Sequence, residues 1–375
     1  MILLIGNYRP DQQQSMRRFA EMMLHGLLAA GVSAELIAPR PVFGNFQSAG
    51  RFIAKWLGYI DKFIFFPRQL RKKLAERPAL VHICDHSNAI YTRWTRSFPV
   101  VVTCHDLLAV RGALGEETNC PASFTGKFLQ RWIVRGLHRA HVIACVSQAT
   151  LRDVRRLVVR NNKSPRLEVV TLGLNYPYQK LSRSEAAARL ARMVHADLGR
   201  PFVLHVGSSA RRKNREGVLR IFAHTKAEWN GQLVFAGDPL EPALRSLGKH
   251  LDLANRIVEV SNPESELLQA LYNCATAFIY PSRFEGFGWP VIEAQACGCP
   301  VICSNAGPLP EVVGEAAMMH SVEDEKAFAA DILRLNDAAE RERWSAKSLR
   351  NAGRFSTPGM IERYIDIYRT LAPQL

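Results

Sequence analysis

The sequence predicts an α/β protein with two domains, each built on a parallel β-sheet that helices cover on both faces. Short apolar, β-branched runs alternate with helix-like stretches along the chain, as buried parallel strands and their connecting helices do. The chain has 375 residues, too many for one ordinary core. Its 47% hydrophobic and 22% charged residues are typical of a soluble globular protein. Two halves of similar size therefore predict twin Rossmann-like domains that face a cleft.

The apolar runs place the individual elements. Strands are expected in the first half at 1–6, 33–37, 80–84, 100–104, 142–146 and 167–171. In the second half they are expected at 202–206, 232–236, 256–260, 275–280 and 301–303. Helices are expected at 11–30, 184–193, 214–227, 241–250, 265–273, 290–297 and 358–371, the last of them amphipathic.

Composition argues against several classes of protein. The apolar start, Met1–Gly6, is about one strand long and follows no cationic segment, so it does not resemble a secretory signal. No run approaches the roughly 20 apolar residues of a membrane-spanning helix. Eight cysteines in so long a chain do not indicate a disulfide framework. A cytoplasmic location is the resulting expectation, with peripheral contact at the inner membrane face left open.

The positive charge is confined to one half. Residues 1–180 contain 26 Lys and Arg against 11 Asp and Glu, whereas residues 181–375 contain 23 of each. A one-sided basic surface favours a polyanion or an anionic membrane leaflet. Aromatic and cationic residues also interleave at 52–73, which indicates either an interfacial helix on anionic lipid or a core helix packed on the sheet. No nucleic-acid motif accompanies the basic half.

Two carboxylates, Glu285 and Glu293, stand eight residues apart around a Gly-Phe-Gly turn. The first follows a strand-like run, and the second lies in a helix-like run. The turn can aim both into one crevice at the carboxyl edge of a parallel sheet, where such sheets bind ligands. The helix start beside them is a ready anion site, so a phosphorylated, polyhydroxylated ligand such as a nucleotide sugar fits.

A second constellation follows the first strand of the second half. The loop from His205 to Asn214 contains Gly207, Ser208 and the cations Arg211, Arg212 and Lys213 before a helix starts. A diphosphate needs such parts: close approach to the backbone, and positive charge at a helix N-terminus. The alternative is an ordinary solvated cationic loop.

These motifs resemble those of the retaining GT-B glycosyltransferases, most closely glycosyltransferase family 4 (glycosyl transferases group 1). The resemblance rests on Glu285-Gly286-Phe287-Gly288, Glu293 and the Gly-Cys-Pro-Val that follows at 298–301. It implies that Glu293 binds the ribose, and that Glu285 with the backbone of 286–288 holds the sugar hydroxyls. It also implies that a basic pair binds the diphosphate. Because Gly207-Ser208 replaces the commoner Gly-Arg, that arginine role passes to Arg211 or Arg212, and we favour Arg212 with Lys213.

In the first half the resemblance assigns fewer residues. His105, at the end of the strand 100–104, matches a family histidine that contacts the donor sugar near the reacting carbon. Asp85 and His86, and the loop residues Asn7 and Ser15, are expected on the acceptor side. Zinc-type residues occur at 82–86, but the paired ligand sets of a zinc site are missing. The resemblance implies no metal and no cofactor, and a final helix, 356–375, that packs back on domain 1–174.

The predicted function is therefore transfer of a hexose, mannose or glucose favoured, from a nucleotide-diphosphate sugar to a hydroxyl of a glycan or lipid-linked acceptor. The nucleotide would be bound by domain 175–355. One alternative is a GT-B sugar-nucleotide epimerase, which needs no acceptor. The other is a non-enzymatic polyanion-binding protein that uses the basic half.

Overall fold

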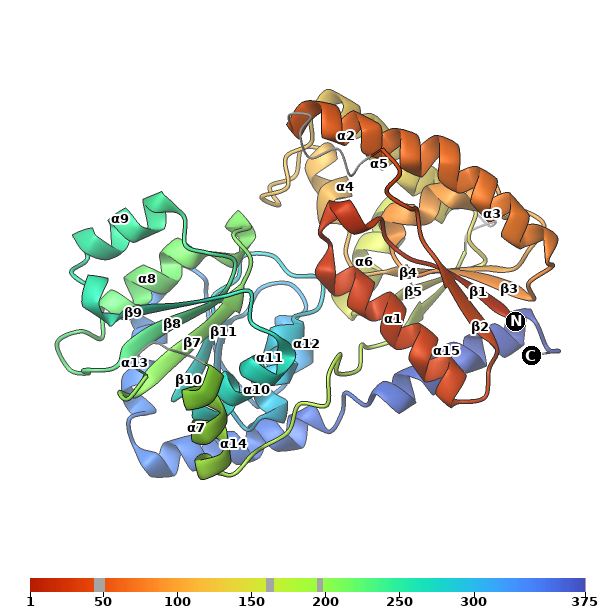
Figure 1. Cartoon of the computed structure of the whole chain (residues 1–375). Helices are drawn as coiled ribbons and strands as arrows, with labels where there is room; N and C mark the ends of the chain where they lie inside the picture. The colour runs from red at the N-terminus through yellow and green to blue at the C-terminus, as the bar shows by residue number, and fades with distance from the viewer. Residues whose placement is uncertain (44–50, 160–164, 194–197, 375) are drawn as a thin grey trace. The chain divides into compact units, whose positions relative to one another are not determined.

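The computed structural model describes residues 1–43, 51–159, 165–193 and 198–374, and the chain divides into two compact units (Figure 1). Unit 1 comprises Met1–Asn175 and Thr357–Leu375, and unit 2 comprises Tyr176–Ser356. Each unit contains one six-stranded sheet, and every described pairing is parallel. Within the described ranges, no helix is long and apolar enough to cross a membrane.

The sheet of unit 1 has the strand order β2-β1-β3-β4-β5-β6. Its strands are β1 (Ile2–Ile5), β2 (Ala34–Ile37), β3 (Leu80–Ile83), β4 (Val100–Cys104), β5 (Val142–Cys145) and β6 (Arg166–Val169). Every residue of β1, β3, β4 and β5 is buried, because helices cover both faces of a parallel sheet.

The helices of unit 1 include one long helix with an interruption. They are α1 (Gln14–Ala29), α2 (Arg51–Ile60), α3 (Phe66–Ala75), α4 (Leu108–Ala113), α5 (Phe124–Leu137), α6 (Gln148–Leu157) and α15 (Thr357–Leu371). A π-helical turn, Asp61–Phe65, joins α2 to α3 (Figure 1). The buried Asp61 carboxylate accepts hydrogen bonds there from the Tyr8 hydroxyl at 2.7 Å and from Val42 N at 3.1 Å.

Helix α15 lies beside α1 and is tied to the sheet of unit 1 by a buried polar network (Figure 1). The Tyr364 hydroxyl is 2.7 Å from Thr103 Oγ1, and the Tyr368 hydroxyl is 2.7 Å from His82 Nδ1. His82 Nε2 is 2.8 Å from the same threonine oxygen. Because every member has a partner, the network fixes the C-terminal helix against β3 and β4.

The sheet of unit 2 has the order β12-β11-β10-β7-β8-β9. Its strands are β7 (Phe202–Gly207), β8 (Gln232–Gly237), β9 (Ile257–Ser261), β10 (Ala277–Tyr280), β11 (Val301–Ser304) and β12 (Met318–His320). Its helices are α7 (Arg183–Met193), α8 (Arg215–Ala223), α9 (Pro242–His250), α10 (Ser265–Cys274), α11 (Trp289–Ala296), α12 (Leu309–Val313), α13 (Glu325–Arg334) and α14 (Ala338–Ala352). Helix α8 contacts α9 and α13, whereas α10 contacts α7 and α11 contacts α14.

The predicted α/β class is confirmed, and each predicted strand appears with ends shifted by at most two residues. Strand β12 was not predicted, because Met-Met-His lacks β-branched residues. In the structure Met319 of this strand is 36% exposed. The core-helix interpretation of 52–73 is confirmed for part of the segment, and contact with anionic lipid stays a prediction. Phe66 and Leu70 pack in the core, whereas Trp56 is 48% exposed.

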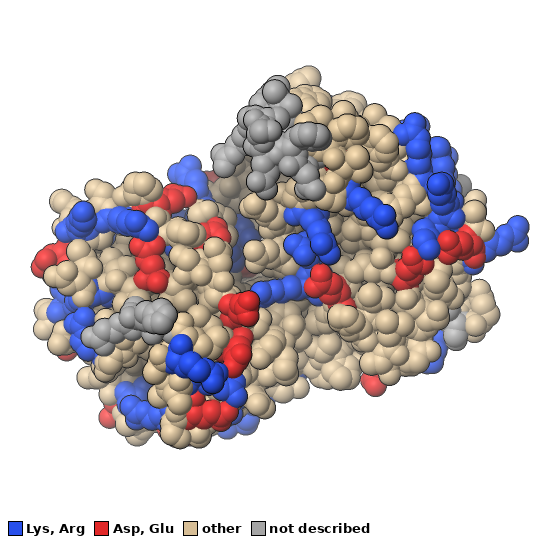
Figure 2. All heavy atoms as spheres, viewed as in Figure 1, with Lys and Arg blue, Asp and Glu red and all other residues tan. Residues whose placement is uncertain are grey.

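The charge differs between the units. Figure 2 shows basic and acidic side chains interspersed over unit 2. Over unit 1, the charged side chains visible on that face are mainly basic (Figure 2), in line with the excess of Lys and Arg in residues 1–180.

Candidate active site

The loop between β10 and α11 ends at a helix start that requires glycine. Gly288 is the N-cap of α11 and has a φ of +107°, where side chains are disfavoured. A Cβ there would lie 2.8 Å from Leu309 Cδ2. The loop can therefore turn tightly beside the positive end of the α11 dipole. Phe287 is 5% exposed and its ring packs edge to face on Phe355, so only its backbone is available to a ligand.

Glu285 lies at the centre of a buried ion cluster in this loop. Its side chain is 6% exposed and accepts hydrogen bonds from Lys213 Nζ at 2.7 Å and Arg212 Nη1 at 3.1 Å. Lys213 also donates to the Tyr280 hydroxyl. Burial raises the pKa of Glu285, but the two cations outweigh it and lower that pKa to about 2. The carboxylate is therefore ionised at neutral pH and positions both cations.

A 3-10 turn, Arg211–Lys213, brings the cations from the end of β7 to the β10–α11 loop. Asn214 follows in a left-handed conformation with a φ of 55°, and its Nδ2 donates to Pro281 O at 3.1 Å. Arg212 is half-buried and also bonds the carbonyl oxygen of Phe284 at 3.2 Å. Arg211 is exposed, and no described contact links it to the ion cluster. This geometry favours Arg212 over Arg211 as the partner of Lys213.

The second carboxylate, Glu293, acts on the same lysine. It lies on α11, is 4% exposed, and accepts a hydrogen bond at 3.1 Å from the hydroxyl of Tyr272 on α10. Burial lowers the pKa of Lys213, while Glu285 and, more weakly, Glu293 raise it. Glu285 therefore contacts Lys213 directly, whereas Glu293 influences it only through its charge.

Gly207 and Ser208 lie half-buried where β7 ends beside β8. Gly237 of β8 has a φ of +131°, and a Cβ there would be 2.3 Å from Gly207 O, so the strand ends approach closely only with glycine. The fully buried His205 precedes this point, with Nδ1 3.0 Å from Ile279 O. Within the described residues its Nε2 has no partner. Burial lowers the pKa of His205 to about 3, so its imidazole is neutral at pH 7.

Four predicted residues of unit 1 lie at the carboxyl edge of its sheet: Asn7 after β1, Asp85 and His86 after β3, and His105 after β4. Asn7 Nδ2 donates to Asp85 Oδ2 at 2.6 Å, and His86 Nδ1 lies 3.0 Å from Asp85 Oδ1. Burial opposes ionisation of Asp85, but His86 and further partners hold its pKa well below the usual range. Asp85 in turn raises the pKa of the buried His86. The edge thus presents a charged carboxylate among amide and imidazole groups.

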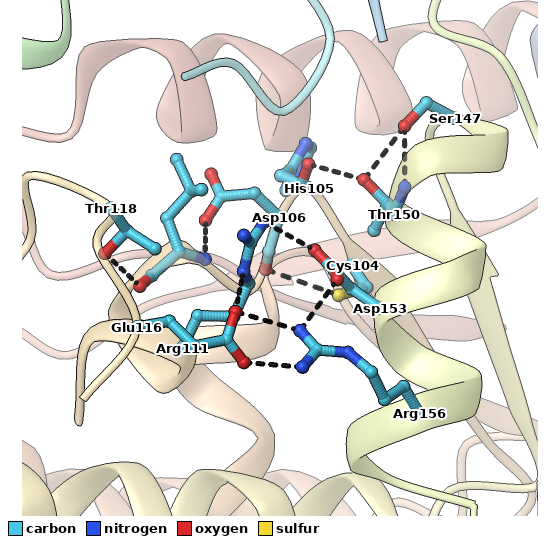
Figure 3. A network of polar contacts seen from close by, with 11 residues as sticks. Cys104, His105, Asp106, Arg111, Glu116, Thr118, Ser147, Thr150, Asp153 and Arg156 are labelled. Carbon is cyan, nitrogen blue, oxygen red and sulfur yellow. Dashed lines mark hydrogen bonds and ion pairs between the residues drawn. The ribbon is translucent and has the colours of Figure 1, made fainter. Parts of the chain in front are cut away.

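His105 is buried and held from several sides. Its Nε2 is 2.9 Å from Cys84 O, and its ring packs edge to face on Phe19 with centroids 4.8 Å apart. Its backbone oxygen accepts a hydrogen bond from Thr150 Oγ1 at 3.3 Å, and Ser147 at the start of α6 donates to that threonine (Figure 3). Burial lowers the pKa of His105, so the neutral imidazole predominates at pH 7.

Ion pairs anchor the segment that follows His105 (Figure 3). Glu116 accepts from Arg111 Nε at 2.8 Å and from Arg156 Nη1 at 2.5 Å. Arg111 also bonds Asp153 of α6 at 3.2 Å. The loop after α4 is therefore fixed to α6, which in turn supports the backbone of His105.

The remaining predicted residue, Ser15, lies two positions after Gln13, whose Oε1 accepts a hydrogen bond from Asn7 Nδ2. Ser15 is exposed in the first turn of α1, and the described contacts do not join it to Asn7 or Asp85. The described residues also contain no group of three or more His, Cys, Asp and Glu that could hold a metal. Sequence reasoning missed Tyr280 and Tyr272, the hydroxyl partners of Lys213 and Glu293. Tyr280 is the lone polar group of the apolar run 277–280, which was the available signal, whereas Tyr272 stands beside the polar Asn273 and carries no such signal.

Known proteins are similar to both halves of this chain. The profile "Glycosyltransferase Family 4" matches residues 16–175, and "Glycosyl transferases group 1" matches residues 190–350. The O-antigen chain mannosyltransferase B of Escherichia coli is 30% identical over 263 residues, which span 65% of this chain and 65% of that protein.

Solved structures share the fold along the whole chain. Sucrose-phosphate synthase from Thermosynechococcus elongatus has a TM-score of 0.79 at 21% identity, covering 100% of this chain and 99% of its own. Anabaena HepE in complex with UDP and glucose has a TM-score of 0.75 at 15% identity, covering 99% of both chains. The chain therefore belongs to the family-4-like glycosyltransferases, the glycosyl transferases group 1, and has their GT-B fold.

Proposed function

We propose that this chain is a retaining hexosyltransferase that uses a nucleoside-diphosphate sugar. The observation that carries the proposal is the ion cluster of unit 2, in which Glu285 pairs with Arg212 and Lys213 at the carboxyl ends of β7 and β10. Glu293 of α11 is near enough to influence the pKa of Lys213. Parallel sheets bind ligands at this edge. Acidic groups there suit hydroxyls, and basic groups suit phosphates.

The diphosphate is proposed to lie against Lys213 and Arg212. An ammonium has three N–H donors, and the described contacts of Lys213 use two of them, to Glu285 and Tyr280. A phosphate oxygen can accept the third in a charge-assisted hydrogen bond. We propose that these protein cations, rather than a metal, offset the charge of the leaving diphosphate. Gly207 and Ser208 would bring backbone close to it.

The nucleoside and the sugar are proposed to contact one carboxylate each. Glu293 would accept hydrogen bonds from the ribose hydroxyls. Glu285 and the backbone of 286–288 would hold the hexose hydroxyls, and neutral His105 would contact the hexose near the reacting carbon. In the reaction, the bond between the anomeric carbon and the diphosphate breaks and a bond to the acceptor oxygen forms on the same face. The acceptor proton passes to the leaving phosphate.

Unit 1 is proposed to present the acceptor, a hydroxyl of a glycan or of a lipid-linked precursor. The Asn7, Asp85 and His86 group supports this, because an ionised carboxylate among donors can orient a hydroxyl. For the hexose, the similarity to an O-antigen mannosyltransferase favours mannose, and the fold neighbour with UDP and glucose keeps glucose as the second choice. A cytoplasmic location with peripheral membrane contact completes the proposal.

The direct test incubates the purified chain with GDP-mannose or UDP-glucose, with and without acceptor glycans, in the presence and absence of EDTA. We expect hexose transfer that needs an acceptor and survives EDTA, and NMR of the product should show the anomeric configuration of the donor. Sugar epimerisation without acceptor would support the epimerase instead. An inverted product would overturn the retaining mechanism. Lys213→Ala should abolish transfer, while Arg211→Ala, its matched control, should not.

A further inference from the structure

We propose that the outer face of α5 docks unit 1 on an anionic lipid bilayer. This inference rests on the peripheral membrane contact proposed above and assigns a specific surface to it. The sequence indicated only the segment 52–73, whereas the structure adds α5. The test measures lipid binding, so its outcome is independent of the test for hexose transfer.

Three aromatic side chains form a stripe along α5. Phe124, Phe128 and Trp132 recur every four residues and are 90%, 54% and 40% exposed. Residues four apart lie on the same side of a helix, so the three rings are neighbours in space. Such a contiguous apolar stripe on a surface marks an interaction site rather than isolated exposure.

The stripe continues onto the neighbouring long helix through ring contacts. Trp132 packs on Phe63 with centroids 6.5 Å apart, Phe63 on Tyr59 at 5.5 Å, and Tyr59 on Trp56 at 5.6 Å. Phe128 contacts Trp132 at 5.3 Å at the other end. The rings therefore form one row across two helices. Rows of Trp and Tyr are typical of proteins at the membrane–water boundary.

Cations run beside the aromatic stripe. Lys127, Arg131 and Arg135 are exposed and also recur every four residues on α5. At its end, Arg93, Arg96 and Arg135 lie close enough to Arg139 to help lower its pKa, after the effect of burial. All four arginines are exposed. A concentration of positive charge next to exposed rings is complementary to anionic headgroups above an apolar interior.

A groove adjoins the same cations on their other side. It has a volume of about 480 Å³, and its polar lining consists of Lys127, Gln130, Arg131, Arg135 and His138. The rest of its lining is apolar, from Val110, Ala113, Leu114, Val134 and Leu157. Leu114 is 64% exposed, so a hydrocarbon chain can reach this apolar lining while its phosphate stays with the cations. This combination favours lipid over a nucleic acid, which would leave the apolar lining unused.

The test is sedimentation with vesicles of phosphatidylcholine alone and of phosphatidylcholine with phosphatidylglycerol. We expect binding only to the anionic vesicles. Lys127→Gln with Arg131→Gln should weaken that binding roughly 30-fold, from about 1 kcal/mol per surface cation. The matched control, Arg152→Gln with Arg155→Gln, removes the same charge from exposed positions of α6 and should change binding by less than about threefold.

A second experiment measures how deeply the aromatic side chains of α5 enter the bilayer. Brominated lipids should quench Trp132 fluorescence, so Trp132→Phe should remove more quenching than Trp344→Phe, its control in unit 2. Phe124→Ser with Phe128→Ser should reduce both binding and quenching, while thermal unfolding stays as in the unmodified protein because both rings are exposed. Equal binding to neutral vesicles, equal loss in both charge variants, or a dimer that Phe128→Ser dissociates would overturn the proposal. Tighter binding to single-stranded DNA than to anionic vesicles would also overturn it.

Discussion

Replacing Glu285 by Gln should destabilise unit 2 by an amount that the structure allows us to work out. In the folded protein the carboxylate has a pKa of about 2 against an ordinary value of 4.5, because Lys213 and Arg212 outweigh the effect of its burial. A difference of about 2.5 corresponds to about 3 kcal/mol of folding free energy at neutral pH. Gln keeps the shape of the side chain but not the charge, so the variant should lose about that much.

The pH dependence has a definite sign. Since folding lowers the pKa of Glu285, its contribution is fully present above about pH 4.5 and is lost as the pH falls towards 2. The unmodified protein should therefore lose stability in this window more steeply than Glu285→Gln, which has no carboxylate to protonate.

Calorimetry measures the effect. Unit 2 comprises Tyr176–Ser356, and for a domain of this size 3 kcal/mol lowers Tm by roughly 6–12 °C. Glu264→Gln, at an exposed position before α10, is the control and should shift Tm by less than about 2 °C. A nucleoside diphosphate should restore part of the loss, because a phosphate can replace the missing partner of Lys213. Equal Tm values for the two variants at pH 7 would refute the assignment of Glu285 as the counter-ion.

Further outcomes test the proposed roles of single residues in each unit. Lys213→Ala should weaken the binding of a nucleoside diphosphate roughly 10- to 100-fold by calorimetric titration, since one charge-assisted hydrogen bond is lost; unchanged affinity would remove the lysine from the diphosphate site. Glu293→Gln should abolish the preference for a ribose over a 2′,3′-dideoxyribose nucleotide, and a preserved preference would place the ribose elsewhere. His105→Ala should reduce kcat by on the order of 100-fold. Because burial lowers the pKa of His105, kcat/KM of the unmodified enzyme should not fall through His105 protonation between pH 8 and 7; a decline there that His105→Ala removes would contradict this.

The strands and the motif positions were predictable from sequence because they depend on local pattern. The runs that became β4 and β10 are short, apolar and bounded by polar turns, so a buried strand was the natural interpretation. Element ends were less predictable: the helix expected to reach residue 227 ends at Ala223. Strand β12 carries no β signal of its own and is held in place by pairing with β11.

The partners of the site residues were not predictable in the same way. No local sequence pattern predicts that Lys213 pairs with Glu285, 72 positions further along the chain. The hydrogen bond from the same lysine to Tyr280 has no local signal either. Likewise, the stripe on α5 was overlooked because Phe124, Phe128 and Trp132 resemble a core-facing pattern. Only burial distinguishes an exposed apolar stripe from a packed one.

The sequence by itself predicted which residues could do chemistry here: two acidic groups around a glycine turn and a basic turn after a strand. Those predictions rest on spacing and side-chain type, whereas the choice of His105 rests on the resemblance to glycosyltransferase family 4. Tertiary structure alone decided which charges meet, which imidazoles stay neutral, and which rings face outward. These depend on distances and burial between segments far apart in the chain, and electrostatic and hydrophobic free energies are set by those quantities.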